Sequence, residues 1–179
     1  MRWYSEKSSE RHIRLRKKPQ EWFAYHSLFE KSKNGFPNIP LEQFIENYKK
    51  INKKLTIGDF GCGTGQVGLE LSNQHNIYSF DHVAYSDHII SCDISKVPVG
   101  NNYFDVALMS LSLMGENSFD YVNEAFRVLK PLGSLIITEL SWNLAHKEIF
   151  LQNIYKSGFC EIKLSENNIF TIISAQKAF

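Results

Sequence analysis

The sequence predicts an α/β fold with a mostly parallel, seven-stranded sheet, helices on both faces and a helical N-terminal part. Residues 1–50 show aromatic side chains at helical spacing and no convincing strand. From residue 55 onward, short apolar runs alternate with longer amphipathic stretches, the pattern of a doubly wound sheet. The last two strand candidates are close in sequence, which favours an antiparallel pair at one edge.

Charge divides the chain into two parts. Its 179 residues, 43% of them apolar, suit one α/β unit, in which we expect a basic helical cap (1–50) and a ligand-binding domain (51–179). Residues 1–54 hold 13 of the 20 Lys and Arg but 6 of the 19 Asp and Glu, a net charge of +7, which leaves −6 for residues 55–179. The basic part is either a set of solvated helix faces or a footprint for a phosphate backbone.

Several protein classes are disfavoured by composition. No stretch approaches the roughly 18 uncharged apolar residues of a membrane span, and the first residues lack the apolar run of a secretory signal. We therefore expect a soluble, intracellular protein with no membrane partner. Cys62, Cys92 and Cys160 form no CxxC pair, so neither a disulfide framework nor a metal site is indicated.

The expected elements follow from apolar spacing. Residues 1–50 should be helical, because their aromatic side chains recur every three to four positions, with an interruption at 36–40 (FPNIP), where proline disfavours helix. Strands are expected at 55–60, 76–80, 88–92, 103–110, 134–140, 159–164 and 169–174. Helices are expected at 66–72, 119–129 and 144–157, and a turn at 131–133 (PLG).

A glycine-rich segment, 61–65 (GCGTG), connects the first expected strand to a helix. Its glycines allow a tight turn and a close approach of backbone to a nucleotide-like ligand. Residues 63–68 also match the dinucleotide pattern GxGxxG. Asp59, two residues before Gly61, would repel a pyrophosphate but suits a cationic ligand. S-adenosylmethionine carries an amine and a sulfonium and no phosphate, so we expect it to meet Asp59, Gly61 and Gly63.

Two further acids come at the ends of the next strands. Asp81 follows Gly61 by roughly the 20 residues at which an acid accepts ribose hydroxyls. Asp93 ends the next expected strand, where it can accept from an adenine amino group. Either acid could instead be a helix cap or turn former. Their order after the glycine loop favours cofactor binding, with S-adenosylhomocysteine as the product.

Several motifs together resemble the ribosomal RNA-processing protein 8 family, also called nucleomethylin. They are WFAYH at 22–26, DFGCG at 59–63, CDISKVP at 92–98, SLSLMG at 110–115 and EAFRVLKP at 124–131. The resemblance implies a Rossmann-like class I S-adenosylmethionine-dependent methyltransferase that acts on N1 of an adenosine in large-subunit ribosomal RNA, in ribosome biogenesis. It also implies ribosomal RNA or a pre-ribosomal particle as partner, and the nucleus and nucleolus as location.

The resemblance also assigns cofactor contacts residue by residue. It places them at His26, Gly61, Asp81, Asp93, Ile94 and Ser110. Without it, a histidine among aromatic residues would be interpreted as a packing residue. The chain departs from the family pattern at Thr64 and Gly65, where an acidic residue and a non-glycine are usual.

Methylation of adenine N1 needs alignment more than a base, because N1 is neutral and has a lone pair. N1 lies on the Watson-Crick edge, so the target must be looped out or flipped. Glu139 is the catalytic candidate, since a carboxylate could stabilise the cationic product, although it could equally be a structural acid. Trp142 could stack on the base, but ordinary packing is favoured for it.

Other functions remain open from the sequence alone. A small-molecule methyltransferase would use the same cofactor residues, and a non-catalytic module could bind S-adenosylmethionine or S-adenosylhomocysteine while docking on RNA or chromatin. A dehydrogenase is less favoured. Amine methyltransferases acting on bases are disfavoured because 110–113 (SLSL) lacks an Asn/Asp-Pro-Pro-aromatic motif. A monomer is favoured.

Overall fold

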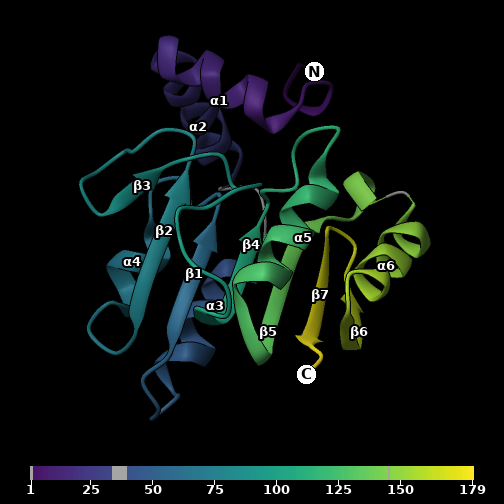
Figure 1. The fold of residues 1–179 in the computed structure, drawn as a ribbon. Helices are drawn as coiled ribbons and strands as arrows, with labels where there is room; N and C mark the ends of the chain where they lie inside the picture. Colours follow the sequence, from purple (N-terminus) through teal and green to yellow (C-terminus); the bar gives the residue numbers. More distant parts are fainter. Residues whose placement is uncertain (1, 34–39, 145) are drawn as a thin grey trace.

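A seven-stranded sheet with the order β3-β2-β1-β4-β5-β7-β6 organises the computed structural model, which describes residues 2–33, 40–144 and 146–179 (Figure 1). Its strands are β1 (Thr56–Phe60), β2 (Asn76–Asp81), β3 (Ile89–Ser91), β4 (Phe104–Ser110), β5 (Leu129–Leu140), β6 (Phe159–Glu166) and β7 (Phe170–Lys177). β7 runs antiparallel to both of its neighbours, and the other pairs are parallel. The expected fold class and its antiparallel edge are confirmed.

The start of β5 differs from the expectation. The strand begins at Leu129, so the turn expected at residues 131–133 lies inside it and that prediction is wrong. Leu129 pairs with Phe104, but Ser134 pairs with Val106, so the partner strand advances by two residues while β5 advances by five. Such a bulge lets a strand absorb extra residues without ending. Leu132 takes a positive φ of 64° within it.

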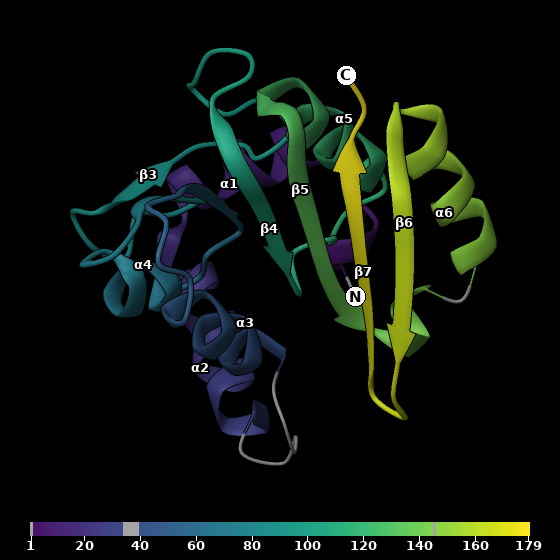
Figure 2. The ribbon, with the colours of Figure 1, turned by 90° about the horizontal axis from the view of Figure 1, so that it is seen from below.

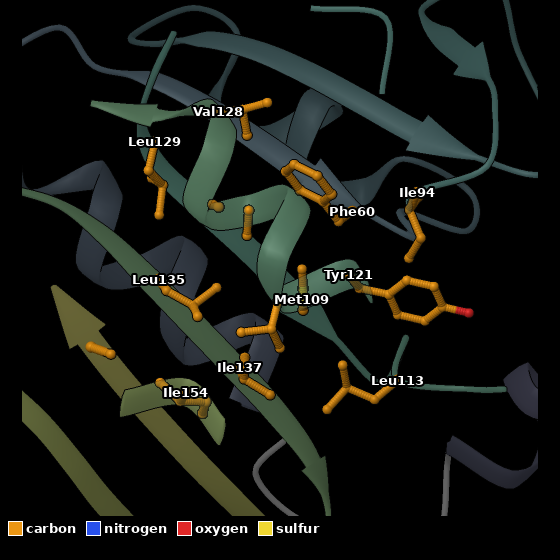
Figure 3. Close-up of a cluster of buried hydrophobic side chains, with 14 of the residues drawn as sticks. Phe60, Ile94, Met109, Leu113, Tyr121, Val128, Leu129, Leu135, Ile137 and Ile154 are labelled. Carbon is orange, nitrogen blue, oxygen red and sulfur yellow. The ribbon is translucent and has the colours of Figure 1, made fainter. Parts of the chain in front are cut away.

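One face of the sheet is covered by α5 (Ser118–Val128) and α6 (Lys147–Lys156). Figure 3 shows Met109, Leu135 and Ile137 of the sheet facing Tyr121 and Val128 of α5, and all five are buried. The buried side of α5 recurs at helical spacing, as its sequence predicts. A short 3-10 helix, η2 (Ser141–Leu144), comes before α6, which therefore starts later than the expected residue 144.

The opposite face carries α3 (Pro40–Lys49) and α4 (Gln66–Leu71), as Figure 2 shows from below. Phe44 and Ile45 of α3 pack with Ile57 of β1 and Val106 of β4 in a second buried cluster. Pro40 begins α3, where its missing N–H costs nothing. The rest of the expected interruption, 36–39, lies outside the described residues.

The remaining N-terminal elements lie across the carboxyl edge of the sheet. They are η1 (Arg2–Tyr4), α1 (Ser8–Lys17) and α2 (Pro19–Lys33), and in Figure 1 the arrowheads of β1 and β2 point toward α1 and α2. These three elements are called the cap below. α3 falls within the expected cap of residues 1–50, but its apolar side packs on the face of the sheet. The boundary expected between residues 50 and 51 stays a prediction. None of the helices described is long and apolar enough to cross a bilayer.

Candidate cofactor site

The site follows from the strand order. The chain runs from β1 outward to β2 and β3, then returns to β4 on the other side of β1. In open α/β sheets, ligands bind at the carboxyl ends of the strands where the order reverses. A cavity that opens to solvent lies there. Its walls come from the glycine loop after β1, the segment after β4, and the cap.

Two glycines of the loop line this cavity in backbone conformations that disfavour side chains. Gly61 has a φ of +78°, and a Cβ added to it would lie 2.4 Å from the Cβ of Ser112. Gly63 has a φ of +58°, and its added Cβ would lie 3.0 Å from Cε1 of His26. The loop therefore needs glycine at both positions, for conformation and for close approach.

Asp81 ends β2, lines the cavity and is buried. Its Oδ2 accepts from the backbone N–H of Gly63 at 2.8 Å, and its Oδ1 accepts from the indole N–H of Trp22 at 2.7 Å. Burial raises its pKa to about 6, although these hydrogen bonds act in the opposite direction. The backbone N–H groups of His82 and Val83 also hydrogen-bond to this carboxylate and lower its pKa, so ligand hydroxyls would share its oxygens with these donors.

Asp59 and Asp93 are not among the described residues that line the cavity. Asp59 lies inside β1, where burial and then the charge of Asp81 raise its pKa to about 7. A cationic ligand nearby would favour its ionised form. Asp93 accepts a hydrogen bond from the backbone N–H of Ser95 at 3.0 Å. This contact is the turn-forming role that was the alternative to cofactor binding for Asp93. The next residue, Ile94, does line the cavity.

His26 reaches the cavity from α2. Its ring lies over that of Trp22, with centroids 3.9 Å apart and planes inclined by 33°. Burial lowers its pKa to about 4, so the imidazole is neutral near pH 7. The structure therefore brings together His26, Gly61, Gly63, Asp81, Ile94 and Ser110 around one cavity.

Glu139 is not among the described residues that line the cavity. It is buried near the end of β5, where its carboxylate accepts from the backbone N–H of Leu140 at 2.9 Å and from Nδ2 of Asn143 at 3.0 Å. Burial raises its pKa. These contacts organise the end of β5, and a catalytic role stays a prediction. Trp142 is 59% exposed.

Sequence reasoning assigned no role to several residues of the cavity wall. They include Trp3, Arg11, Tyr25, Ser112 and Met114. Arg11 is 2% exposed and donates to the carbonyl oxygen of Met114 at 2.8 Å, across 103 positions of sequence. Its position in a basic helix gave no sign of burial. The described residues contain no group of three His, Cys, Asp or Glu side chains placed to hold a metal ion.

This sheet order, with the glycine loop and cavity at its switch point, defines the fold of class I S-adenosylmethionine-dependent methyltransferases. A TehB-like S-adenosylmethionine-dependent methyltransferase from Corynebacterium glutamicum superimposes with a TM-score of 0.69 at 17% identity, over 89% of this chain and 99% of that one. The chain belongs to the family described as "hypothetical methyltransferase", whose model matches residues 1–179.

Curated relatives carry more specific names. A Dictyostelium discoideum protein named ribosomal RNA-processing protein 8 is 37% identical over 86% of this chain and 40% of its own length. A Schizosaccharomyces pombe protein named 25S rRNA (adenine(645)-N(1))-methyltransferase is 30% identical over 98% of this chain and 61% of its own length. The chain thus spans 40% and 61% of these relatives. The resemblance to the ribosomal RNA-processing protein 8 family is confirmed.

Proposed function

We propose that this protein transfers a methyl group from S-adenosylmethionine to N1 of an adenosine in large-subunit ribosomal RNA. The observation that carries the proposal is the Schizosaccharomyces pombe relative, which bears that activity in its name and is similar over 98% of this chain. The RNA would be met as ribosomal RNA or a pre-ribosomal particle, in the nucleolus. The net charge of +7 on residues 1–54 supports attraction of a phosphate backbone.

In this proposal the cofactor lies in the cavity and meets several separate segments of the chain. Asp81 would accept the ribose hydroxyls, and Asp93 with Ile94 would hold the adenine. The backbone of Gly61 and Gly63 would lie against the ligand, because an added Cβ at either position would meet Ser112 or His26. The buried carboxylate of Asp59 would favour the cationic amino-acid end. His26 and Ser110 would complete the contacts.

When bound, the cofactor supplies a methyl group activated by its sulfonium. The protein's share is orientation, because the N1 lone pair of adenine needs no general base. N1 is blocked in a duplex, so the cavity must receive an unpaired or flipped base. Trp22, Tyr25 and Phe29 line the cavity and would help to exclude water from it once the cofactor and the base are bound. Glu139 would act only on the cationic product, and unchanged transfer by Glu139→Gln would remove it from the proposal.

The test is transfer of labelled methyl from S-adenosylmethionine to unmodified large-subunit ribosomal RNA, followed by nucleoside analysis. We expect N1-methyladenosine at a single site with the wild-type protein. Asp81→Ala should abolish transfer, while Asp87→Ala, an equal loss of charge at an exposed position outside the cavity lining, should not. Transfer to small acceptors without RNA would replace the proposal with a small-molecule enzyme. Cofactor binding without any transfer would replace it with a non-catalytic module.

A further inference from the structure

A buried hydroxyl group in the wall of the cavity has no hydrogen-bond partner. Ser112 is 7% exposed and lines the cavity. Its Oγ is the one fully buried side-chain nitrogen or oxygen in the described part of the chain that makes no hydrogen bond. Buried polar groups are nearly always paired, because desolvating one without compensation is unfavourable. An unpaired hydroxyl in the wall of a ligand cavity therefore points to a ligand group that completes it.

The position of Ser112 places that ligand group at the reacting end of the cavity. The residue comes two positions after the end of β4, and its side chain lies against Gly61, whose added Cβ would be 3.3 Å from Oγ. Asp81 is bonded instead to Gly63, at the other side of the loop. If Asp81 receives the ribose, Ser112 lies beyond it, on the side of the sulfonium and the methyl acceptor.

Aromatic rings line the same cavity. Trp3 and Tyr25 are stacked, with ring centroids 4.6 Å apart and planes inclined by 27°. Phe29 continues the stack, 6.5 Å from Tyr25 and inclined to it by 14°. All three line the cavity together with Ser112. Aromatic rings in the wall of a cavity that also holds an unpaired hydrogen-bonding group suit a planar heterocycle that carries a polar edge.

We propose that Ser112 binds the acceptor base, with its Oγ accepting a hydrogen bond from the 6-amino group beside N1 of adenine. This inference rests on the proposed function. The cationic amine of the cofactor would be attracted by the charge of the buried Asp59 carboxylate behind the glycine loop, which leaves the neutral hydroxyl for a neutral amino group. Guanine and uracil carry a carbonyl oxygen at the corresponding position, so neither offers Oγ this amino donor.

The contact strengthens as the reaction proceeds. The N1 lone pair forms the new bond to the methyl carbon while the carbon–sulfur bond breaks and its electron pair stays on sulfur. The positive charge passes to the base and spreads onto the 6-amino nitrogen, whose N–H becomes a stronger donor. An interaction that is stronger in the transition state than in the ground state raises kcat.

The experiment pairs Ser112→Ala with removal of the 6-amino group. A ribosomal RNA fragment containing the mapped site is synthesised with adenosine or purine riboside at that position, and kcat/KM is measured for both enzymes. The ratio of kcat/KM for adenosine to kcat/KM for purine riboside also reflects the lower intrinsic reactivity of purine riboside. That contribution is the same for both enzymes, so it cancels when their ratios are compared. S-adenosylhomocysteine affinity is measured alongside by calorimetry, and Ser165→Ala on the remote strand β6 is the control.

We expect Ser112→Ala to lower the ratio by about tenfold, as loss of one hydrogen bond implies, with S-adenosylhomocysteine affinity unchanged. An unchanged ratio would overturn the inference and leave the proposed function intact. Weaker S-adenosylhomocysteine binding with an unchanged ratio would also overturn it and assign Ser112 to the cofactor. Absence of RNA methylation by the wild-type protein would overturn the proposed function and this inference with it.

Discussion

The two walls of the cavity are held in place by different interactions. The sheet wall rests on two apolar clusters, in which Phe60, Leu135 and Ile137 are 0% exposed. The cap is joined to it by polar contacts, among them Arg11 to the Met114 carbonyl oxygen and Trp22 to Asp81. Structure that rests on few buried apolar contacts opens locally at low free energy. We therefore expect the glycine loop to keep its shape when the cap opens.

The largest expected effect tests the sheet wall. Leu135→Ala leaves a hole between β5 and α5 and should lower the free energy of unfolding by about 2 to 5 kcal/mol, measured by urea denaturation. Leu69→Ala, at a side chain that is 67% exposed, should change it by less than about 0.5 kcal/mol. Equal effects of the two substitutions would contradict the assignment of stability to the sheet core.

An intermediate effect is expected in the cap. Arg11→Ala removes the charged donor of the hydrogen bond to the Met114 carbonyl oxygen, which keeps the hydroxyl of Tyr121 as its other donor, and the structure loses about 1 to 3 kcal/mol. Because the contact belongs to the cap, the loss should appear as faster hydrogen exchange in α1 and α2 and as weaker S-adenosylhomocysteine binding. Amides of β1 and β4 should keep their protection. Arg16→Ala, at an exposed position on the same helix, is the control. Uniform loss of protection would show that cap and sheet unfold together.

A third expected effect is a difference in the sign of the pH dependence of stability. His26 of the cap has a pKa of about 4, below the value of about 6.5 in an unfolded chain, so the unfolded state binds more protons between these values. Its contribution to stability is complete above about pH 6.5 and is lost as the pH falls toward 4. Asp59 of the sheet has a raised pKa of about 7, so its contribution is instead lost as the pH rises from about 4 to 7.

Single substitutions separate the two contributions. His26→Gln should reduce the loss of stability on acidification, and Asp59→Asn should reduce the loss on alkalinisation, both followed as the thermal midpoint against pH. A change of the same sign in both variants would contradict the opposite shifts of the two pKa values.

The parts of the site that the sequence predicts are those encoded by neighbours in the chain. The glycine loop and Asp81 were found because strand, loop and acid follow one another at regular spacing. The burial of Arg11 was missed because it depends on a carbonyl group 103 positions away in the sequence. The place of Ser112 in the cavity wall was missed because it depends on packing against Gly61. The bulge in β5 was missed because pairing with β4 overrides the turn preference of PLG. Local pattern carries no information about such distant contacts.

The side chain of Asp81 is one of the groups that join the two walls of the cavity. Asp81 accepts from Trp22 of the cap on one carboxylate oxygen and from the glycine loop on the other. The carboxylate proposed to bind the ribose therefore also holds the cap in place through its hydrogen bond to Trp22. The two effects are thermodynamically linked. If a bound ribose stabilises the closed position of the cap by a certain free energy, closing the cap strengthens ribose binding by the same free energy. Retention of the ligand and shielding of the reacting centre from water then become coupled through the side chain of Asp81.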